Sequence, residues 1–207
     1  TKMKTSFLFT LVFIVLASCS KSDDNSSASY RSTPDYDISI DGRTLIKWKN
    51  PNTTELDMQA DSELKRVNTI AKEAFKEHQN LQSITFPNNL KEIEESAFED
   101  ANLSGEVVFN TKATVDFGEK CFYHTHLKKI TFPNMSVLGI NAFSVCRDLK
   151  EVTFNKVKKL DIFALRDCNA ASLTFEGTGL TEIGHGAFVG MWKLKELTLP
   201  ETLTRIE

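Results

Sequence analysis

Residues 81–98 read LQSITFPNNLKEIEESAF, and the apolar pattern of this stretch returns along the chain. The pattern is L-x-x-I-x-F-P-x-x-L-x-x-I-x-x-x-A-F, and it closes on an Ala-Phe pair. The closing position repeats at intervals of 21 to 24 residues, in Phe75, Phe98, Phe122, Phe143, Leu165 and Phe188. One turn of this length cannot bury its apolar side alone, so the period predicts a solenoid of stacked coils.

Two further columns of apolar residues keep the same period. The strand-end column closes a short run of alternating residues and holds Phe86, Phe109, Phe132, Phe154, Phe175 and Leu199. The third column stands five residues before the Ala-Phe column and holds Ile70, Ile93, Phe117, Leu138, Leu160, Ile183 and Ile206. In a stack, each side chain packs between its equivalents in neighbouring coils, and full burial of one such group contributes about 1.5–3 kcal/mol.

The runs that lead into the strand-end column alternate with a period of two and are rich in β-branched and aromatic residues, which predicts strands. The predicted strands are Ser83–Phe86, Lys129–Phe132, Glu151–Phe154, Ser172–Phe175 and Glu196–Leu199. Strands of successive coils pair in parallel about 4.8 Å apart. We therefore predict an α/β repeat solenoid of about six coils of 21–24 residues, with a parallel β-sheet on one face.

The repeat resembles the BspA-like, or Treponema-type, leucine-rich repeat, whose hallmark is I-G-x-x-A-F-x-x-C-x-x-L. Residues 183–188 (IGHGAF) match its front half, and residues 142–149 (AFSVCRDL) match its back half. The resemblance covers residues 64–207. Two coils depart from the pattern: Cys121 replaces the usual Ala, and Leu165 and Ala170 stand where larger residues are expected. The resemblance implies a surface lipoprotein built on leucine-rich repeats.

The repeat pattern also divides the chain. We expect residues 70–207 to form the solenoid and residues 35–69 to form a cap or variant first repeat, with Trp48 covering the first Phe pair. Another Ala-Phe pair is due five residues after Ile206. We therefore expect a solenoid truncated at the C-terminus, the alternative being a last coil without the polar closing face that terminal repeats need.

The first 18 residues have the features of a secretory signal peptide. A short positive start at Lys4 precedes the apolar run Phe7–Leu16, which is too short for a bilayer span of about 20 residues. The run closes on Leu16-Ala17-Ser18-Cys19, which resembles a bacterial lipobox and makes Cys19 the lipid attachment site. The alternative is an ordinary cleaved signal with an incidental cysteine.

Residues 19–34 follow as the lipidated cysteine and a Ser-rich polar tether that is too poor in apolar residues to order itself. Acyl chains on Cys19 would hold the protein to a membrane by about 0.8 kcal/mol per buried methylene. Within the tether, residues 21–24 (KSDD) resemble the charged signal that sends some lipoproteins to the outer face of the outer membrane. The alternative for these four residues is a solvated linker.

Composition excludes one class of partner. The chain has 207 residues, 25 basic against 28 acidic side chains and a net charge of −3, with 41% hydrophobic residues. This is the composition of an ordinary folded domain. Nucleic acid binding demands a basic stripe, which this balance argues against.

No catalytic motif is present: the chain lacks G-x-S-x-G, G-x-x-x-x-G-K-[ST], G-x-G-x-x-G and H-E-x-x-H. We therefore expect no enzyme activity, no cofactor and no metal. His124 and His126 could face one side of a strand, but zinc needs three or four ligands, so exposed loop histidines are the favoured interpretation.

Cys146 and Cys168 stand 22 residues apart, which is one coil. Stacked in adjacent coils, they meet the distance criterion for a disulfide. The alternative, favoured here, is a ladder of buried thiols that act as small apolar fillers.

The exposed side of the predicted sheet forms a flat polar platform, which we take as the candidate partner-binding face. One row is formed mainly by threonines and a neighbouring row by lysines. The candidate residues are Thr85, Lys128, Thr131, Lys150, Thr153, Thr174, Lys195 and Thr198. Threonine also suits any exposed strand, because cross-strand pairs contribute about 0.2–1 kcal/mol.

The resemblance implies adhesion to a host matrix protein or to another cell through the solenoid surface. A second hypothesis is a glycan- or nutrient-capture accessory at the outer membrane, which would need exposed aromatic platforms. The candidates for such platforms are Trp48, Tyr123 and Trp192. A third hypothesis, an enzyme acting through a further domain, has no support in the sequence.

Overall fold

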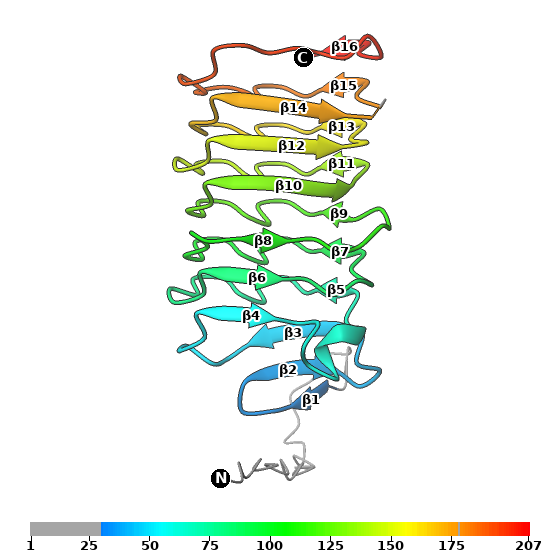
Figure 1. Ribbon diagram of the computed structural model, residues 1–207, viewed down its shortest axis with the longest axis vertical. Helices are drawn as coiled ribbons and strands as arrows, with labels where there is room; N and C mark the ends of the chain where they lie inside the picture. The colour runs from blue at the N-terminus through cyan, green and yellow to red at the C-terminus, as the bar shows by residue number, and fades with distance from the viewer. Residues whose placement is uncertain (1–29, 178) are drawn as a thin grey trace, which may run out of the picture.

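The computed structural model describes residues 30–177 and 179–207. The expected signal peptide, Cys19 and the tether up to residue 29 lie outside the described residues. The tether was predicted to continue to residue 34, but Tyr30–Ser32 form β1 and pair with β2, so the described sheet begins at residue 30. Within them the chain is a β-solenoid, whose coils stack along one axis from β1 at the N-terminal end to β16 at the C-terminal end (Figure 1). The predicted repeat solenoid is therefore confirmed.

Most coils carry one strand on a long-strand face and a short, mostly two-residue strand on the opposite side. The long-strand face holds β4 (Glu55–Asp57), β6 (Ser83–Thr85), β8 (Val107–Val108), β10 (Lys129–Asn134), β12 (Glu151–Asn155) and β14 (Ser172–Glu176). The opposite side holds β1 (Tyr30–Ser32), β2 (Tyr36–Ser39), β3 (Thr44–Trp48), β5 (Thr69–Ile70), β7 (Glu92–Ile93), β9 (Asp116–Phe117), β11 (Val137–Leu138), β13 (Lys159–Leu160), β15 (Glu182–Ile183) and β16 (Arg205–Ile206).

The strands form three sheets. A ten-stranded sheet runs in the order β1-β2-β3-β5-β7-β9-β11-β13-β15-β16, with the β1–β2 and β2–β3 pairs antiparallel and the rest parallel. The third column lies in this sheet, because Ile70 pairs with Ile93 and Ile93 with Phe117. Strand formation by this column was not predicted. The long-strand face is divided into two three-stranded sheets, β4-β6-β8 and β10-β12-β14.

Helix is nearly absent from the described residues, although an α/β solenoid was expected. The helix found among them is the 3-10 helix η1 (Leu64–Arg66). The reason lies in the backbone around the Ala-Phe column. The residues two before and two after it have positive φ in successive coils, for example Asn141 (53°) and Val145 (65°) around Phe143. A left-handed residue cannot continue a right-handed helix, so each segment is a turn.

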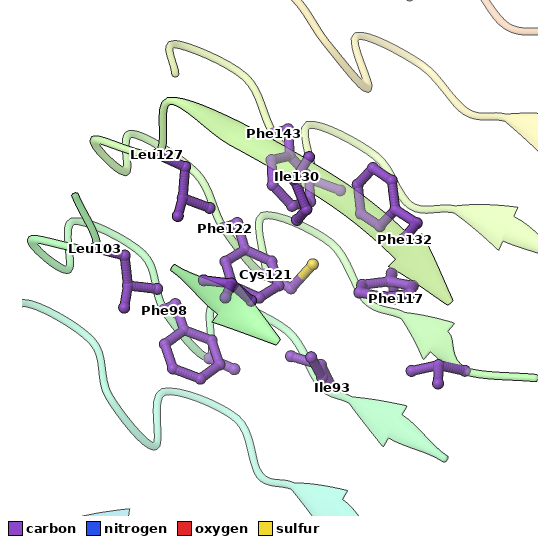
Figure 2. Close-up of a cluster of buried hydrophobic side chains, with 14 of the residues drawn as sticks. Ile93, Phe98, Leu103, Phe117, Cys121, Phe122, Leu127, Ile130, Phe132 and Phe143 are labelled. Atoms are coloured by element: carbon purple, nitrogen blue, oxygen red, sulfur yellow. The ribbon is translucent and has the colours of Figure 1, made fainter. Parts of the chain in front are cut away.

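The Ala-Phe column forms a continuous pile of rings from Phe75 to Phe143, and Leu165 follows them in the next coil. Centroids are 4.7 Å apart for Phe75–Phe98, 4.9 Å for Phe98–Phe122 and 4.8 Å for Phe122–Phe143, and all three pairs are stacked. Figure 2 shows part of this pile beside Cys121 and Phe117. Trp48 stacks on Phe75 at 5.8 Å, as expected, and Tyr36 on Trp48 at 5.6 Å. The core is therefore one continuous cluster of packed side chains along the solenoid axis, to which all three columns contribute.

The predicted strand Glu196–Leu199 was wrong. Within the described residues the long-strand face ends at β14, and residues 193–199 form no backbone hydrogen bond with that strand. Leu197 is 36% exposed, whereas its equivalents Val152 and Leu173 are buried. Alternation alone does not make a strand, since the ladder hydrogen bonds are needed as well.

The cysteines of the interior are free thiols. Cys121, Cys146 and Cys168 are all buried, and the thiol ladder favoured from the sequence is present. The Cys146 thiol donates to the Phe122 carbonyl at 3.2 Å, and the Cys168 thiol to the Phe143 carbonyl at 2.9 Å. Each thiol thus satisfies a main-chain carbonyl of the coil before it. Burial also raises the pKa of the Cys121 thiol, which keeps it protonated.

Candidate functional site

The predicted partner-binding face coincides with the long-strand face, but the structure divides it. Thr131, Thr153 and Thr174 pair in register across β10, β12 and β14. Thr85 belongs to the other sheet, where it pairs with Val108 of β8. Thr198 follows Leu197 in the segment that is not a strand. Three of the predicted threonines therefore form one row and two do not join it.

The predicted lysines divide in the same way. Lys128 and Lys150 are neighbours in successive coils, because the Lys150 N–H donates to the Lys128 carbonyl at 2.8 Å. Both side chains are exposed, and neither forms an ion pair with another described residue. Lys195 lies in the exposed segment beyond β14. Lys129 and Glu151, which pair in register at the starts of β10 and β12, form an ion pair of 2.9 Å.

The threonine row rests on a rigid base. Ile130, Val152 and Leu173 alternate with the threonines along β10, β12 and β14 and point into the core, where they are 1%, 1% and 7% exposed. Two residues further along the same strands and on the same inward side, Phe132, Phe154 and Phe175 stack at 5.2 and 5.1 Å. A face fixed by two rows of packed side chains loses little conformational entropy when a partner binds.

The hollow that interrupts this face was not predicted. No ladder joins β8 to β10 in the described part of the chain. Between these strands lies an open cleft of about 930 Å³, within the range of about 300–1,000 Å³ of ligand pockets. Its lining residues are Ser104, Gly105, Glu106, Val107, Val108, Phe109, Thr111, Lys112, Lys128, Lys129, Thr131, Phe132, Pro133, Asn134, Asn155 and Lys156.

A one-residue insertion distinguishes the coil at this break. Five residues separate Leu81 from Phe86 and Leu127 from Phe132, but six separate Leu103 from Phe109. The extra residue is accommodated at Gly105, whose N–H donates to the Gln82 carbonyl at 2.9 Å ahead of β8. An extra residue of this kind disturbs the neighbouring ladder. This irregular spacing is the sequence signal that would have located the cleft.

The stacking of the strand-end column beneath the cleft is interrupted at the same place. Phe86 stacks on Phe109 at 4.9 Å, but Phe109 does not stack on Phe132. Instead Phe117 lies between them, in edge contact with Phe109 at 5.8 Å and with Phe132 at 5.3 Å. Figure 2 shows Phe117 beside Phe132. On the opposite side β9 still pairs with both β7 and β11. The two coils are therefore held together there and separate only on the long-strand face.

The expected exposed loop histidines are confirmed. His124 lies 2.6 Å from Asp100 and His126 lies 2.9 Å from Asp148, and both imidazoles are half exposed outside the strands. Each histidine has its own aspartate, so the two do not converge on a common ligand. Among the described residues, no group of three or more His, Cys, Asp or Glu side chains is arranged to hold a metal ion.

The aromatic residues considered for a glycan platform are not gathered on one surface. Trp48 is 7% exposed and is held between Tyr36 and Phe75, with its indole N–H donating to the Thr53 hydroxyl at 3.1 Å. Tyr123 is half-buried, and Trp192 is 88% exposed near the C-terminal end. Trp48 is thereby removed from the candidates. In the part of the chain described, no helix has the length and apolarity to cross a membrane.

Stacked coils of 21 to 24 residues, each with an Ala-Phe turn and a parallel strand ladder, define a leucine-rich repeat solenoid. The chain belongs to the family of the BspA type leucine rich repeat region, whose model matches residues 50–115 and 115–207 with six copies. The resemblance noted in the sequence is thus confirmed. Repeats of this family are a scaffold that presents a surface. A search of the curated proteins finds no match.

Solved structures share the fold at low sequence identity. A leucine-rich repeat protein from Eubacterium ventriosum superposes with a TM-score of 0.67 at 16% identity, over 88% of this chain and 49% of that one. A leucine rich cell surface protein from Faecalibacterium prausnitzii gives 0.54 at 18%, over 83% and 55%. The pneumococcal vaccine antigen PcpA gives 0.55 at 20%, over 87% and 42%. The chain spans about half the length of these structures.

Proposed function

We propose that the chain is the binding module of a bacterial cell-surface lipoprotein and that its long-strand face adheres to a host matrix protein or to another cell. The observation that carries this proposal is the rigid row of Thr131, Thr153 and Thr174, flanked by Lys128 and Lys150. Such a face offers many weak contacts spread along an extended partner. The family match supports a surface repeat protein, and one structural neighbour is described as a cell surface protein.

A protein partner suits this face better than a glycan. Glycan capture would need exposed rings in a row, and Trp48 is buried while Trp192 lies outside the strands that carry the threonine row. Polar side chains on a flat sheet instead match the hydrogen-bonding groups of a protein surface. Soluble full chain should therefore bind saturably to an immobilised matrix protein. A Thr131→Glu/Thr153→Glu variant should lose that binding, while Thr69→Glu, on the opposite sheet, should not.

Anchoring is the second part of the proposal: an acylated Cys19 holds the protein to the outer membrane, and residues 20–29, which precede β1, link it to the solenoid. Cys19→Ala should move the protein from the membrane fraction to the soluble fraction. Membrane association that persists in this variant would contradict lipid attachment at Cys19. Protease treatment of intact cells tests display, because a protein that faces inward survives the treatment.

A further inference from the structure

We propose that the cleft between β8 and β10 is a recognition site for an extended acidic peptide segment of a partner protein. This inference rests on the proposed binding function and names the place and the chemistry of one contact. Three features of the cleft carry it: unpaired strand edges, a surplus of lysines, and an apolar floor.

The two strand edges that face the cleft have unpaired main-chain groups. On β8, the main-chain carbonyls of Glu106 and Val108 point toward β6. They accept hydrogen bonds from the Ile84 and Phe86 N–H groups at 3.0 and 2.9 Å. Alternate residues of a strand point their main-chain groups to opposite sides. The N–H and C=O of Val107 therefore point toward β10.

The edge of β10 has the complementary arrangement. The Lys128 carbonyl accepts from β12 through the Lys150 N–H, so the main-chain groups of Lys129 and Thr131 face β8. No described residue donates to or accepts from these groups across the cleft. Unpaired edge groups are the element that an added peptide strand uses when it extends a sheet. One edge is enough for such pairing.

The charge of the lining selects an acidic peptide. Lys112, Lys128, Lys129 and Lys156 line the cleft against a single acid, Glu106. Lys129 is engaged with Glu151, while the other three lysines form no ion pair with a described residue. This concentration of free positive charge occurs in a chain whose net charge is −3. Complementary charge on a partner increases its rate of association and fixes its register.

The apolar part of the lining favours a peptide over a polysaccharide as the ligand of the cleft. Val107 and Phe132 are buried at the floor, and Phe109 is half-buried. These groups can pack against small apolar side chains that alternate with acidic ones along a strand. They do not present the open ring faces on which sugars stack, so the cleft fits a peptide in which acidic and small residues alternate.

The test is fluorescence anisotropy of a labelled peptide of alternating Glu and Val, titrated with the purified full chain. We expect saturable binding that weakens as salt is added. Lys112→Glu/Lys128→Glu should weaken it about tenfold or more, because two attractive contacts become repulsive. The matched control is Lys65→Glu/Lys91→Glu, which changes net charge equally at exposed lysines outside the cleft. The control should bind the peptide like the unaltered chain.

Two further probes address main-chain pairing and the polysaccharide alternative. The same peptide with alternate amides N-methylated should bind much more weakly, because it cannot pair with the strand edges. Equal binding of the methylated peptide, equal weakening by both lysine pairs, or tighter binding of heparin or alginate at the same lysines would overturn the proposal. If no peptide binds while the matrix protein still does, this inference fails and the proposed function stands. If the chain binds the peptide but no matrix protein, the cleft is a peptide site and the proposed adhesion to matrix protein fails.

Discussion

At the scale of single residues, the Ala-Phe turn depends on two left-handed positions in each coil. Among the described turns, glycine occupies both positions only in the last one, at Gly186 and Gly190, with φ of 63° and 75°. The other turns use residues with side chains, including the β-branched Val145. A Cβ in this conformation costs about 1–2 kcal/mol. The fold therefore tolerates repeated backbone strain in order to bury the phenylalanine between the two positions.

Val145→Gly should stabilise the protein. Release of the left-handed strain exceeds the extra entropy of glycine in the unfolded chain, and we expect a net gain of about 0.5–1 kcal/mol in the free energy of unfolding. Val137→Gly is the control, because Val137 lies in β11 without positive φ and should lose stability instead. Urea unfolding of both variants gives the comparison. Loss of stability in Val145→Gly would mean that its half-buried side chain matters more than its backbone.

Phe143→Ala tests the pile of rings directly. Phe143 is fully buried, stacked on Phe122 at 4.8 Å and in edge contact with Phe132 at 5.0 Å. Its removal should cost about 3–5 kcal/mol. Phe163 is a half-buried phenylalanine outside the columns, so Phe163→Ala should cost clearly less. Calorimetry distinguishes the two, and an unchanged melting temperature in Phe143→Ala would reject its role in the core.

At the scale of elements, the parallel ladders place equivalent residues of successive coils side by side, and their charges then matter. Lys159 pairs with Glu182 at 3.2 Å across β13 and β15. Across β7 and β9, in contrast, Glu92 stands beside Asp116 in register. Partial burial raises the pKa of the Glu92 carboxyl, and the nearby Glu94 and Asp116 raise it further.

The raised pKa of Glu92 predicts a pH-dependent stability difference. The folded state binds the proton more tightly than the unfolded state, so this group favours folding at low pH. That contribution is lost as pH rises from the unfolded value of about 4.3 through the folded pKa. Glu92→Gln should therefore raise the melting temperature at neutral pH, and the gain should shrink in acid. Glu55→Gln is the control, because Glu55 pairs with Ser83. A gain that persists unchanged in acid would reject the electrostatic explanation.

The elements of the fold were predictable where apolar residues recur at the same position in every coil. The three columns fixed the coil length and the strands Ser83–Thr85, Lys129–Asn134, Glu151–Asn155 and Ser172–Glu176 to within two residues at each end. The segment around Leu197 was missed because its alternation is strand-like while its partners for hydrogen bonding are absent among the described residues. The short strands such as Glu92–Ile93 were missed because two residues are too few to show a period.

At the scale of the whole molecule, the candidate binding surface was only partly predictable. The repeat predicts that Thr131, Thr153 and Thr174 align, because it averages over all coils. It cannot predict the cleft, which arises where one coil departs from the average by the residue inserted between Leu103 and Phe109. In a solenoid the regular positions determine stability, and the exceptions create distinct sites.

The same reasoning predicts that the stack tolerates the loss of one complete coil. Deletion of residues 139–160 removes one member of each column and joins Leu138 to Asp161. Leu138 then takes the place of Leu160, its register partner in the next coil. Since each coil contacts only its neighbours, the shortened chain should retain a cooperative β-rich fold with stability reduced by about one interface. Deletion of residues 139–149 is the control, because it shifts every later column out of register and should abolish cooperative unfolding. Circular dichroism and urea titration of both deletions decide the matter, and equal loss of structure in the two would show that the coils are not interchangeable units.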